Sequence, residues 1–269
     1  MVLRYAAFTT DPTKGNPAGV VLDAAGLPDA EMQRIAAEVG YSETAFVCGG
    51  SRPQYTVRYF SPLAEVPFCG HATIATAVAL ADRDGPGDLV FETPSGAIPV
   101  HTEAGTASLT SVPTRSRPAR SSELSPALAA LRWLPADVDP AWPPHVAFAG
   151  NDHLMLAART RARLADLDYD FPALQALMTR AGWTTVHLFW ADGAVFHARD
   201  PFPPGGVVED PATGSAAAAF GGYLLELGRA PAEFTIIQGE DMGRRAELTV
   251  HATPGDPRVR VSGTATLIP

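Results

Sequence analysis

Lysine is almost absent from this sequence. Lys14 stands alone against nineteen arginines, and it lies in a Thr-Lys-Gly-Asn turn. Because pyridoxal phosphate enzymes hold their cofactor on a lysine, the sequence argues against that class. Cysteine is equally scarce: Cys48 and Cys69 are the only two, too few for a disulfide framework in a chain of 269 residues.

Long apolar runs and an excess of positive charge are also missing. No apolar stretch reaches the roughly 18 residues that a membrane helix needs, and the start Met1–Tyr5 is typical of a strand rather than of a signal peptide. The net charge is 20 − 29 = −9, which repels phosphate backbones and anionic lipid surfaces. We therefore expect a soluble, cytoplasmic protein that binds neither nucleic acid nor membranes.

Motifs for metals, nucleotides and hydrolytic nucleophiles are absent as well. The seven histidines show no metal-ligand spacing, since His145 and His153 lie eight residues apart without a carboxylate pattern between them. Gly205-Gly206 lacks the lysine of a phosphate-binding loop, and no Gly-Xaa-Ser-Xaa-Gly elbow occurs. We expect no metal and no cofactor.

What the sequence does contain is a globular composition with many short strands. Hydrophobic residues make up 46% and charged residues 18%. Apolar residues at helical spacing predict a helix over Pro28–Val39 that Gly40 ends. The stretch Ser111–Ser122, rich in Pro, Ser and Arg, is interpreted as a linker. Strands are predicted over 3–8, 19–22, 55–60, 89–92, 107–110, 146–148, 153–157, 186–190, 194–198, 234–238, 246–251, 258–261 and 265–268.

The two halves of the chain resemble each other. Glu65–Ala72 and Glu209–Ala216 share Glu, Pro, Gly and Ala at an offset of 144 residues. Two shorter matches keep the same order: Gly40–Ser42 with Gly182–Thr184, and Gly15-Asn16 with Gly150-Asn151. Such a duplication predicts two similar domains with a cleft between them.

Each half contains a segment that is apolar on nearly every side, starting at Gly70 and at Gly214. A helix of this kind is buried, so we predict one central helix per domain. The small residues at both starts leave backbone N–H groups accessible to an anion such as a substrate carboxylate. The alternative is ordinary capping of the second helix by Thr213 or Ser215.

Four motifs together resemble those of the PhzF-like family of phenazine biosynthesis, over nearly the whole chain. They are Gly15–Val21, Ser42–Phe46, Pro67–Thr73 and Glu209–Ala216. The resemblance implies an α+β fold of the diaminopimelate-epimerase type, with two pseudo-symmetric domains that each wrap a curled, mainly antiparallel sheet around a central buried helix. It places the domains at 1–115 and 123–263, with a final strand, 264–269, that crosses back to the first. It also implies a homodimer.

The resemblance assigns roles to individual residues. Glu43 matches the family's catalytic acid/base, with His71 and Asp210 as supporting catalytic residues. Substrate-binding positions are Asn16, Gly70, His71, Thr213, Gly214 and Ser215. In diaminopimelate epimerase two thiols act as paired bases; here one position is Cys69 and the other is Thr213, which argues against a symmetric two-thiol racemase and leaves Cys69 as a candidate only.

Without the resemblance, Glu43 could be a surface glutamate, His71 a core histidine, Asp210 a turn cap and Cys69 a small buried residue. With it, we expect a cofactor-independent isomerase or epimerase that moves a proton on a small carboxylated metabolite. The alternative is a PhzF-like protein that binds a ligand or partner without catalysis. Uptake of deuterium from heavy water into a substrate would separate the two, because only the isomerase exchanges a carbon-bound proton.

Overall fold

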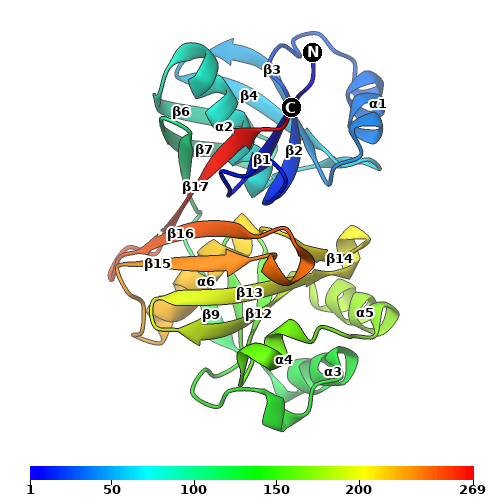
Figure 1. Ribbon diagram of the computed structural model, residues 1–269, viewed down its shortest axis with the longest axis vertical. Helices are drawn as coiled ribbons and strands as arrows, with labels where there is room; N and C mark the ends of the chain where they lie inside the picture. The colour runs from blue at the N-terminus through cyan, green and yellow to red at the C-terminus, as the bar shows by residue number, and fades with distance from the viewer. The chain divides into compact units, whose positions relative to one another are not determined.

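The computed structural model describes residues 1–269, which form two compact units. Unit 1 comprises Met1–Thr110 and Ser262–Pro269, and unit 2 comprises Ser111–Val261. Each unit contains a mixed sheet and one long buried helix (Figure 1). No helix of the structure is both long and apolar enough to span a membrane.

The sheet of unit 1 curls around the helix α2 (Gly70–Asp84). Its strands are β1 (Leu3–Ala7), β2 (Asn16–Val21), β3 (Thr44–Ser51), β4 (Gln54–Phe60), β5 (Glu65–Val66), β6 (Gly87–Thr93), β7 (Gly96–Glu103), β8 (Thr106–Thr110) and the end of β17 (Val259–Leu267). The pairing order is β17–β1–β2–β3–β4–β6–β7–β8, with β2–β3 and β4–β6 parallel and the other pairs antiparallel. A backbone hydrogen bond from Ala265 to Gly105 brings β17 next to the turn before β8.

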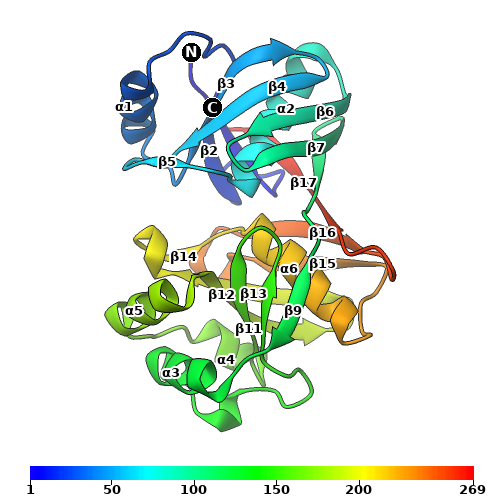
Figure 2. The same cartoon turned by 180° about the vertical axis from the view of Figure 1, so that it is seen from behind.

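Unit 2 repeats this order around the helix α6 (Gly214–Glu226). Its strands are β9 (Arg115–Pro118), β10 (His145–Phe148), β11 (Asp152–Ala157), β12 (Trp183–Asp192), β13 (Val195–Phe202), β14 (Val207–Asp210), β15 (Glu233–Gln238) and β16 (Ala246–Ala252). They pair as β9–β10–β11–β12–β13–β15–β16, with β11–β12 and β13–β15 parallel. β9 stands beside β10 as β17 stands beside β1, and Figure 2 shows α6 alongside β9.

The remaining helices cover the outside of the sheets. They are α1 (Asp29–Val39), α3 (Ser121–Leu131), α4 (Arg161–Ala165), α5 (Phe171–Ala181) and the short 3-10 turns η1 (Pro135–Asp137), η2 (Pro203–Gly205) and η3 (Glu240–Met242). α1 ends as the sequence predicts: Gly40 adopts a left-handed conformation at φ 71° and donates its N–H to Ala36. α1 joins β2 to β3 in unit 1, and α5 lies in the connection from β11 to β12 in unit 2. The duplication thus extends to the helices.

Both central helices are buried as predicted. Every residue from His71 to Ala81 in α2 is buried, and so are the residues from Ala216 to Leu224 in α6. Small side chains let the surrounding strands approach closely: a Cβ added at Gly222 would lie 2.5 Å from the side chain of Thr114, just before β9. Phe220 of α6 packs at ring distances of 4.6 to 5.9 Å against Phe189, Phe196 and Phe234.

The interpretation of Ser111–Ser122 as a linker was wrong. Four of its residues form β9, which pairs with β10 at the edge of the unit 2 sheet, and α3 begins at Ser121. Pro118 ends β9, and an edge strand tolerates proline because one row of its backbone groups needs no sheet partner.

A buried polar network crosses three strands of unit 2. His153 on β11 lies 2.8 Å from the Thr185 hydroxyl through Nδ1, and Thr185 donates to Asp200 at 3.2 Å. His187 lies 2.7 Å from the other oxygen of Asp200. The Nε2 atoms of both histidines are buried without a hydrogen-bond partner, which favours the neutral imidazole at His153 because a charged ring would donate from both nitrogens.

This network predicts an acid sensitivity of unit 2. Burial lowers the pKa of His153 to about 4, with Asp200 opposing the shift and His187 adding to it. The unfolded chain, with an ordinary histidine pKa of about 6.5, therefore binds more protons than the folded one between these two values. Stability should fall as pH drops through that window, by up to about 3 kcal/mol from this residue.

The test is the pH dependence of the free energy of urea unfolding for His153→Asn. Asparagine keeps a polar atom near Thr185 but does not titrate, so the loss between pH 7 and pH 4 should be smaller than in the parent protein. His101→Asn, which changes a half-exposed histidine of unit 1, is the control. Parallel pH curves for the parent and His153→Asn would contradict the prediction.

Candidate active site

Glu43 lies between the end of α1 and the start of β3, where the backbone is closely held. Its carbonyl oxygen accepts a hydrogen bond from the N–H of Gly19 at 3.2 Å. A Cβ added at Gly19 would lie 2.5 Å from the Thr44 hydroxyl, so a glycine is needed for β2 to approach β3 here. The neighbouring strand therefore fixes the position of the Glu43 backbone.

The side chains of Glu43, Cys69 and His71 converge in unit 1. The Sγ atom of Cys69 is 3.5 Å from Oε2 of Glu43, and Nε2 of His71 is 3.5 Å from the same oxygen. Cys69 Sγ also lies 3.3 Å from Nδ1 of His71. Glu43 keeps 16% of its side chain exposed, while His71 keeps 5%, so the carboxylate is the member of the cluster that a substrate can reach.

His71 is held in its neutral form. Burial lowers its pKa, and the nearby Glu43 carboxylate only partly opposes this shift. The Ser42 hydroxyl lies 3.3 Å from its Nε2. Nε2 faces Ser42 and Glu43, while Nδ1 faces the sulfur of Cys69. A neutral imidazole has one donor and one acceptor nitrogen, so one of these two sides can receive a hydrogen bond from His71 and the other can donate to it.

The start of α2 is built from Cys69 and Gly70. Cys69 occupies the N-cap position but provides no side-chain hydrogen bond to the first turn. Its carbonyl accepts from the Thr73 hydroxyl at 2.7 Å, and Thr73 in turn meets the Tyr59 hydroxyl at 2.8 Å in the core. The start of α2 is thus held by these hydrogen bonds to the core. The Cys69 side chain does not cap the first N–H groups of the helix, so these groups can bind an anion.

Asn16, the other predicted residue of unit 1, is the first residue of β2 and is 1% exposed. It follows Gly15, where glycine is required because φ is 61° and an added Cβ would lie 2.3 Å from the Ala7 carbonyl oxygen. A buried amide in an apolar sheet must be hydrogen-bonded. Asn16 therefore has a structural role at this turn in addition to any contact with substrate.

In unit 2 the structure brings Asp210 and Thr213 together. The Thr213 hydroxyl donates to Oδ2 of Asp210 at 2.7 Å. Gln238, fully buried at the end of β15, donates to the Asp210 carbonyl at 2.8 Å and accepts from the Thr213 N–H at 3.1 Å. Asp210 is therefore tied to the turn that precedes α6.

α6 begins at Gly214, with Ser215 in its first turn. Thr213 is the N-cap residue, but its hydroxyl is directed to Asp210 and gives no capping hydrogen bond. The alternative of ordinary capping by Thr213 is thus not what the structure shows. The starts of α2 and α6 share the same property, since neither N-cap side chain occupies the first-turn N–H groups.

The two units differ at the position of the carboxylate. The repeat that aligns Gly40–Ser42 with Gly182–Thr184 places Thr185 opposite Glu43, and Thr185 is committed to the buried network with Asp200. Unit 2 therefore has a threonine where the repeat of unit 1 has Glu43.

Sequence reasoning missed two polar residues around these groups. Ser42 was seen only as part of a motif, yet it contacts His71. Gln238 ends the apolar strand Glu233–Gln238, and a fully buried amide at the end of such a strand was the signal available. Neither contact could be found from spacing, because each depends on strands and helices far apart in the chain.

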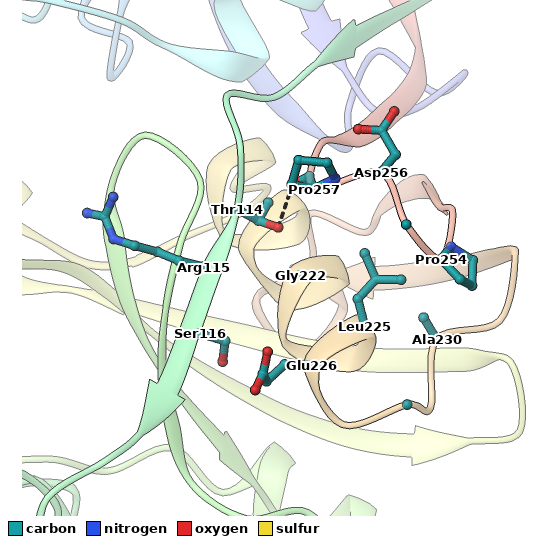
Figure 3. A pocket seen from close by; sticks show the side chains of 12 residues that line it. Thr114, Arg115, Ser116, Gly222, Leu225, Glu226, Ala230, Pro254, Asp256 and Pro257 are labelled. Atoms are coloured by element: carbon teal, nitrogen blue, oxygen red, sulfur yellow. Dashed lines mark hydrogen bonds between the residues drawn. The ribbon is translucent and has the colours of Figure 1, made fainter.

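A cavity of about 460 Å³ in unit 2 contains none of the predicted residues. It lies at the far end of α6, between β9 and the loop that contains Pro254 and Asp256 (Figure 3). Thr114 closes one side by donating its hydroxyl to the Pro257 carbonyl at 2.7 Å. Asp256 is already engaged by the backbone N–H of Arg258, so the cavity offers little of the chemistry that the helix starts present.

Comparison with known proteins agrees with these features. The profile of the PhzC-PhzF family, described as phenazine biosynthesis-like protein, matches residues 5–269. An uncharacterized isomerase, YddE, of Escherichia coli K12 is 33% identical, over 99% of this chain and 96% of its own. Trans-2,3-dihydro-3-hydroxyanthranilate isomerase of Pseudomonas chlororaphis is 32% identical, over 96% of this chain and 93% of its own.

A crystal structure of the Bacillus anthracis phenazine biosynthesis protein of the PhzF family has a TM-score of 0.89 and 27% identity, over 100% of this chain and 96% of that one. This likeness confirms the expected α+β class with two pseudo-symmetric, epimerase-like units. Because the curated relatives are named isomerases, the non-catalytic alternative loses support. The chain belongs to the PhzC-PhzF family of phenazine biosynthesis-like proteins and is an isomerase.

Proposed function

We propose that this isomerase moves a proton between carbon atoms of a small carboxylated metabolite, with Glu43 as the acid/base and without a cofactor. The observation that carries the proposal is the partly exposed Glu43 carboxylate beside the buried, neutral His71. A carboxylate in such a place can break a C–H bond by taking the proton and can return it to another carbon.

The other predicted residues receive supporting parts. His71, whose Nε2 lies 3.5 Å from the Glu43 carboxylate, supports the position of that side chain. The first-turn N–H groups at Gly70 and those at Gly214 are each candidates for binding a carboxylate, because uncapped helix starts favour an anion. Asn16, Thr213 and Ser215 complete substrate binding, and Asp210 supports catalysis through its bond to Thr213.

The experiment is a screen for deuterium uptake from heavy water, read by mass spectrometry and NMR. The panel should contain amino acids and cyclic carboxylates, including trans-2,3-dihydro-3-hydroxyanthranilate, the substrate named for a relative of 32% identity. We expect at least one compound to exchange a carbon-bound proton. A compound that binds tightly but never exchanges would support ligand binding without proton transfer.

Cys69→Ala should cost much less activity than loss of Glu43. The thiol touches the carboxylate at 3.5 Å, but the proposal gives it no proton to carry. Its removal should therefore lower exchange by well under the hundredfold that a positioned acid or base contributes at minimum. Rates of deuterium uptake under saturating substrate would check this, with the half-buried Cys48→Ala as control.

The homodimer stays a prediction. Sedimentation equilibrium of the full chain would test it, with a mass of twice 28.3 kDa as the expected result.

A further inference from the structure

Gln238 is a buried amide at the end of β15, and its side chain is bonded to a single turn, the one that precedes α6. Its Nε2 donates to the Asp210 carbonyl at 2.8 Å and to the Thr213 hydroxyl at 3.1 Å. Its Oε1 accepts from the Thr213 N–H at 3.1 Å. The side chain is 0% exposed. Because a buried amide is costly unless it is paired, these three bonds compensate for its burial.

The partners of Gln238 fix which way its amide points. A backbone N–H can only donate and a backbone carbonyl can only accept, so Oε1 faces the Thr213 N–H and Nε2 faces the Asp210 carbonyl. The Thr213 hydroxyl therefore receives a hydrogen from Nε2 and still has its own hydrogen to give. It donates this hydrogen to Oδ2 of Asp210 at 2.7 Å. The result is a directed hydrogen-bond chain from Gln238 through Thr213 to the Asp210 carboxylate.

The fold does not require this chain. The repeat places Val66 and Cys69 of unit 1 at the positions that Asp210 and Thr213 occupy in unit 2. Valine has no carboxylate to receive a hydrogen bond, yet the sheet of unit 1 has the same pairing order as that of unit 2. The chain is therefore a feature of unit 2 that calls for an explanation other than topology.

The chain controls the direction of one hydroxyl. The hydrogen of a threonine hydroxyl turns freely about its C–O bond and follows the groups around it. Because Nε2 of Gln238 donates to the Thr213 oxygen, the hydroxyl hydrogen is directed away from that side and toward Asp210. A hydrogen bond donated to a carboxylate favours its ionised form.

The other charged groups near Asp210 lie on neighbouring strands. Asp200 of β13 is directly opposite Asp210 and is paired with His187 of β12. Glu209, the preceding residue, is paired with Arg199. All four residues are retained in every variant used below, so a change in the titration of Asp210 reports on the chain.

We propose that Gln238 is a positioning residue of the isomerase, which holds the Thr213 hydroxyl as a donor to Asp210 and thereby keeps the Asp210 carboxylate ionised and oriented. Gln238 itself touches no reacting atom and carries no proton. The effect on catalysis rests on the proposed supporting role of Asp210, whereas the hydrogen-bond chain does not.

The chain is tested first without substrate. In protein labelled with ¹³C at the aspartate carboxyl groups, the Asp210 resonance is identified by its absence in Asp210→Asn, and NMR measures its titration midpoint. Gln238→Met keeps the length of the side chain but removes its three hydrogen bonds. We expect this variant to raise the midpoint by about one pH unit, because the hydrogen bond to the charged carboxylate is weakened.

Two changes at Thr213 show whether Gln238 acts through this residue. Thr213→Val removes the hydroxyl and should raise the midpoint by a similar amount, while Thr213→Ser should keep the parent value. Adding Gln238→Met to Thr213→Val should move the midpoint no further. The control is Gln175→Met, since Gln175 also donates to a backbone carbonyl, that of Pro203 at 3.0 Å, but is not part of the chain.

The catalytic effect is measured as deuterium uptake. In Gln238→Met, kcat should fall about tenfold with a smaller change in KM, the size expected when a hydrogen bond to a charged group is lost. Gln175→Met should leave both unchanged. Circular dichroism checks that each variant folds, and Thr213→Val keeps the test decisive if Gln238→Met does not.

The two proposals fail separately. Equal midpoints in parent and Gln238→Met, or a further shift when Gln238→Met is added to Thr213→Val, would overturn the chain. A raised midpoint with unchanged exchange would overturn the catalytic effect and speak against Asp210 as a supporting residue. If no compound of the screen exchanges a proton, the proposed function fails, while the carboxyl titration still decides the chain.

Discussion

Replacement of Glu43 by glutamine should lower deuterium exchange and turnover by about a hundred- to ten-thousand-fold, the usual contribution of a positioned acid or base. Glutamine keeps the shape of the side chain and its capacity to form hydrogen bonds, but it cannot accept and return a proton. The loss should appear in kcat with little change in KM, because substrate binding is assigned to helix N–H groups rather than to this carboxylate.

The folded protein should tolerate this change. Glu43 is partly shielded from solvent and lies 3.5 Å from the buried His71, so a neutral amide removes a charge that is costly to shield from water. The free energy of unfolding should therefore hold or rise, as is common when a functional residue is neutralised. Urea unfolding of parent and Glu43→Gln would check this.

The control is Glu38→Gln, five positions earlier on the exposed side of α1, where 64% of the side chain is accessible. It should leave exchange unchanged. Near-normal exchange in Glu43→Gln combined with complete loss in Cys69→Ala would show the assignment to be wrong, and would move the protein toward a thiol-based epimerase.

Much of the fold follows from local signals in the sequence. The two apolar segments begin as helices at Gly70 and Gly214, the residues at which the small-residue motifs predicted their starts. Gly40 ends α1 because only a left-handed residue can close the helix there. In β7, Ile98 and Val100 are buried between exposed neighbours, which is the period-two alternation of a strand. Pro99 and His101 made this alternation hard to recognise in the sequence.

Other elements had signals that were not used. α5 has Asp170 as N-cap, proline at its start and Gly182 in a left-handed conformation at its end, a complete set of helix boundaries. α3 contains Pro126 inside the helix, which argues against a helix by propensity alone. In α3 the packing of Leu128 and Leu131 against the unit 2 core stabilises the helix despite this proline.

The site could be predicted as a set of residues but not as a geometry. Motifs identified Glu43, Cys69 and His71 separately, yet their convergence depends on β3 and α2 being brought together by the sheet of unit 1. The link from Asp210 through Thr213 to Gln238 is of the same kind. Such contacts are decided by tertiary packing, and a single sequence does not encode them as a spacing.

The repeat also includes an arginine–glutamate ion pair in each unit, close in sequence to the start of its central helix. In unit 1, Arg58 on β4 donates to both oxygens of Glu65 at 2.7 and 2.8 Å. In unit 2, Arg199 on β13 binds Glu209 in the same two-pronged manner, with one bond of 2.9 Å. Both glutamates belong to the duplicated motif, and each precedes its central helix by five residues.

The two pairs differ in burial. Arg58 and Glu65 are 24% and 34% exposed, whereas Arg199 and Glu209 are 10% and 6% exposed. Arg199 also donates to the Ala165 carbonyl at 2.6 Å, which ties β13 to α4. Glu209 precedes Asp210 directly, so this pair holds the strand that carries a predicted catalytic residue.

Arg199→Met should therefore destabilise the protein by about 3 to 5 kcal/mol, the cost of leaving a buried charge without its partner. The same change at the more exposed partner, Arg58→Met, should cost about 1 kcal/mol or less, because water can solvate Glu65. Urea unfolding would measure both, with hydrogen exchange of the β13–β14 backbone to show which unit opens.

A compensating variant separates charge from packing. Arg199→Met combined with Glu209→Leu removes both charges, and apolar replacement of a whole buried pair is often neutral or stabilising. The double variant should thus recover most of the loss, although the bond to Ala165 stays broken. The prediction is contradicted if Arg199→Met and Arg58→Met lower the free energy of unfolding equally, or if the double variant is as unstable as Arg199→Met. In either case the burial of the pair does not determine its contribution to stability.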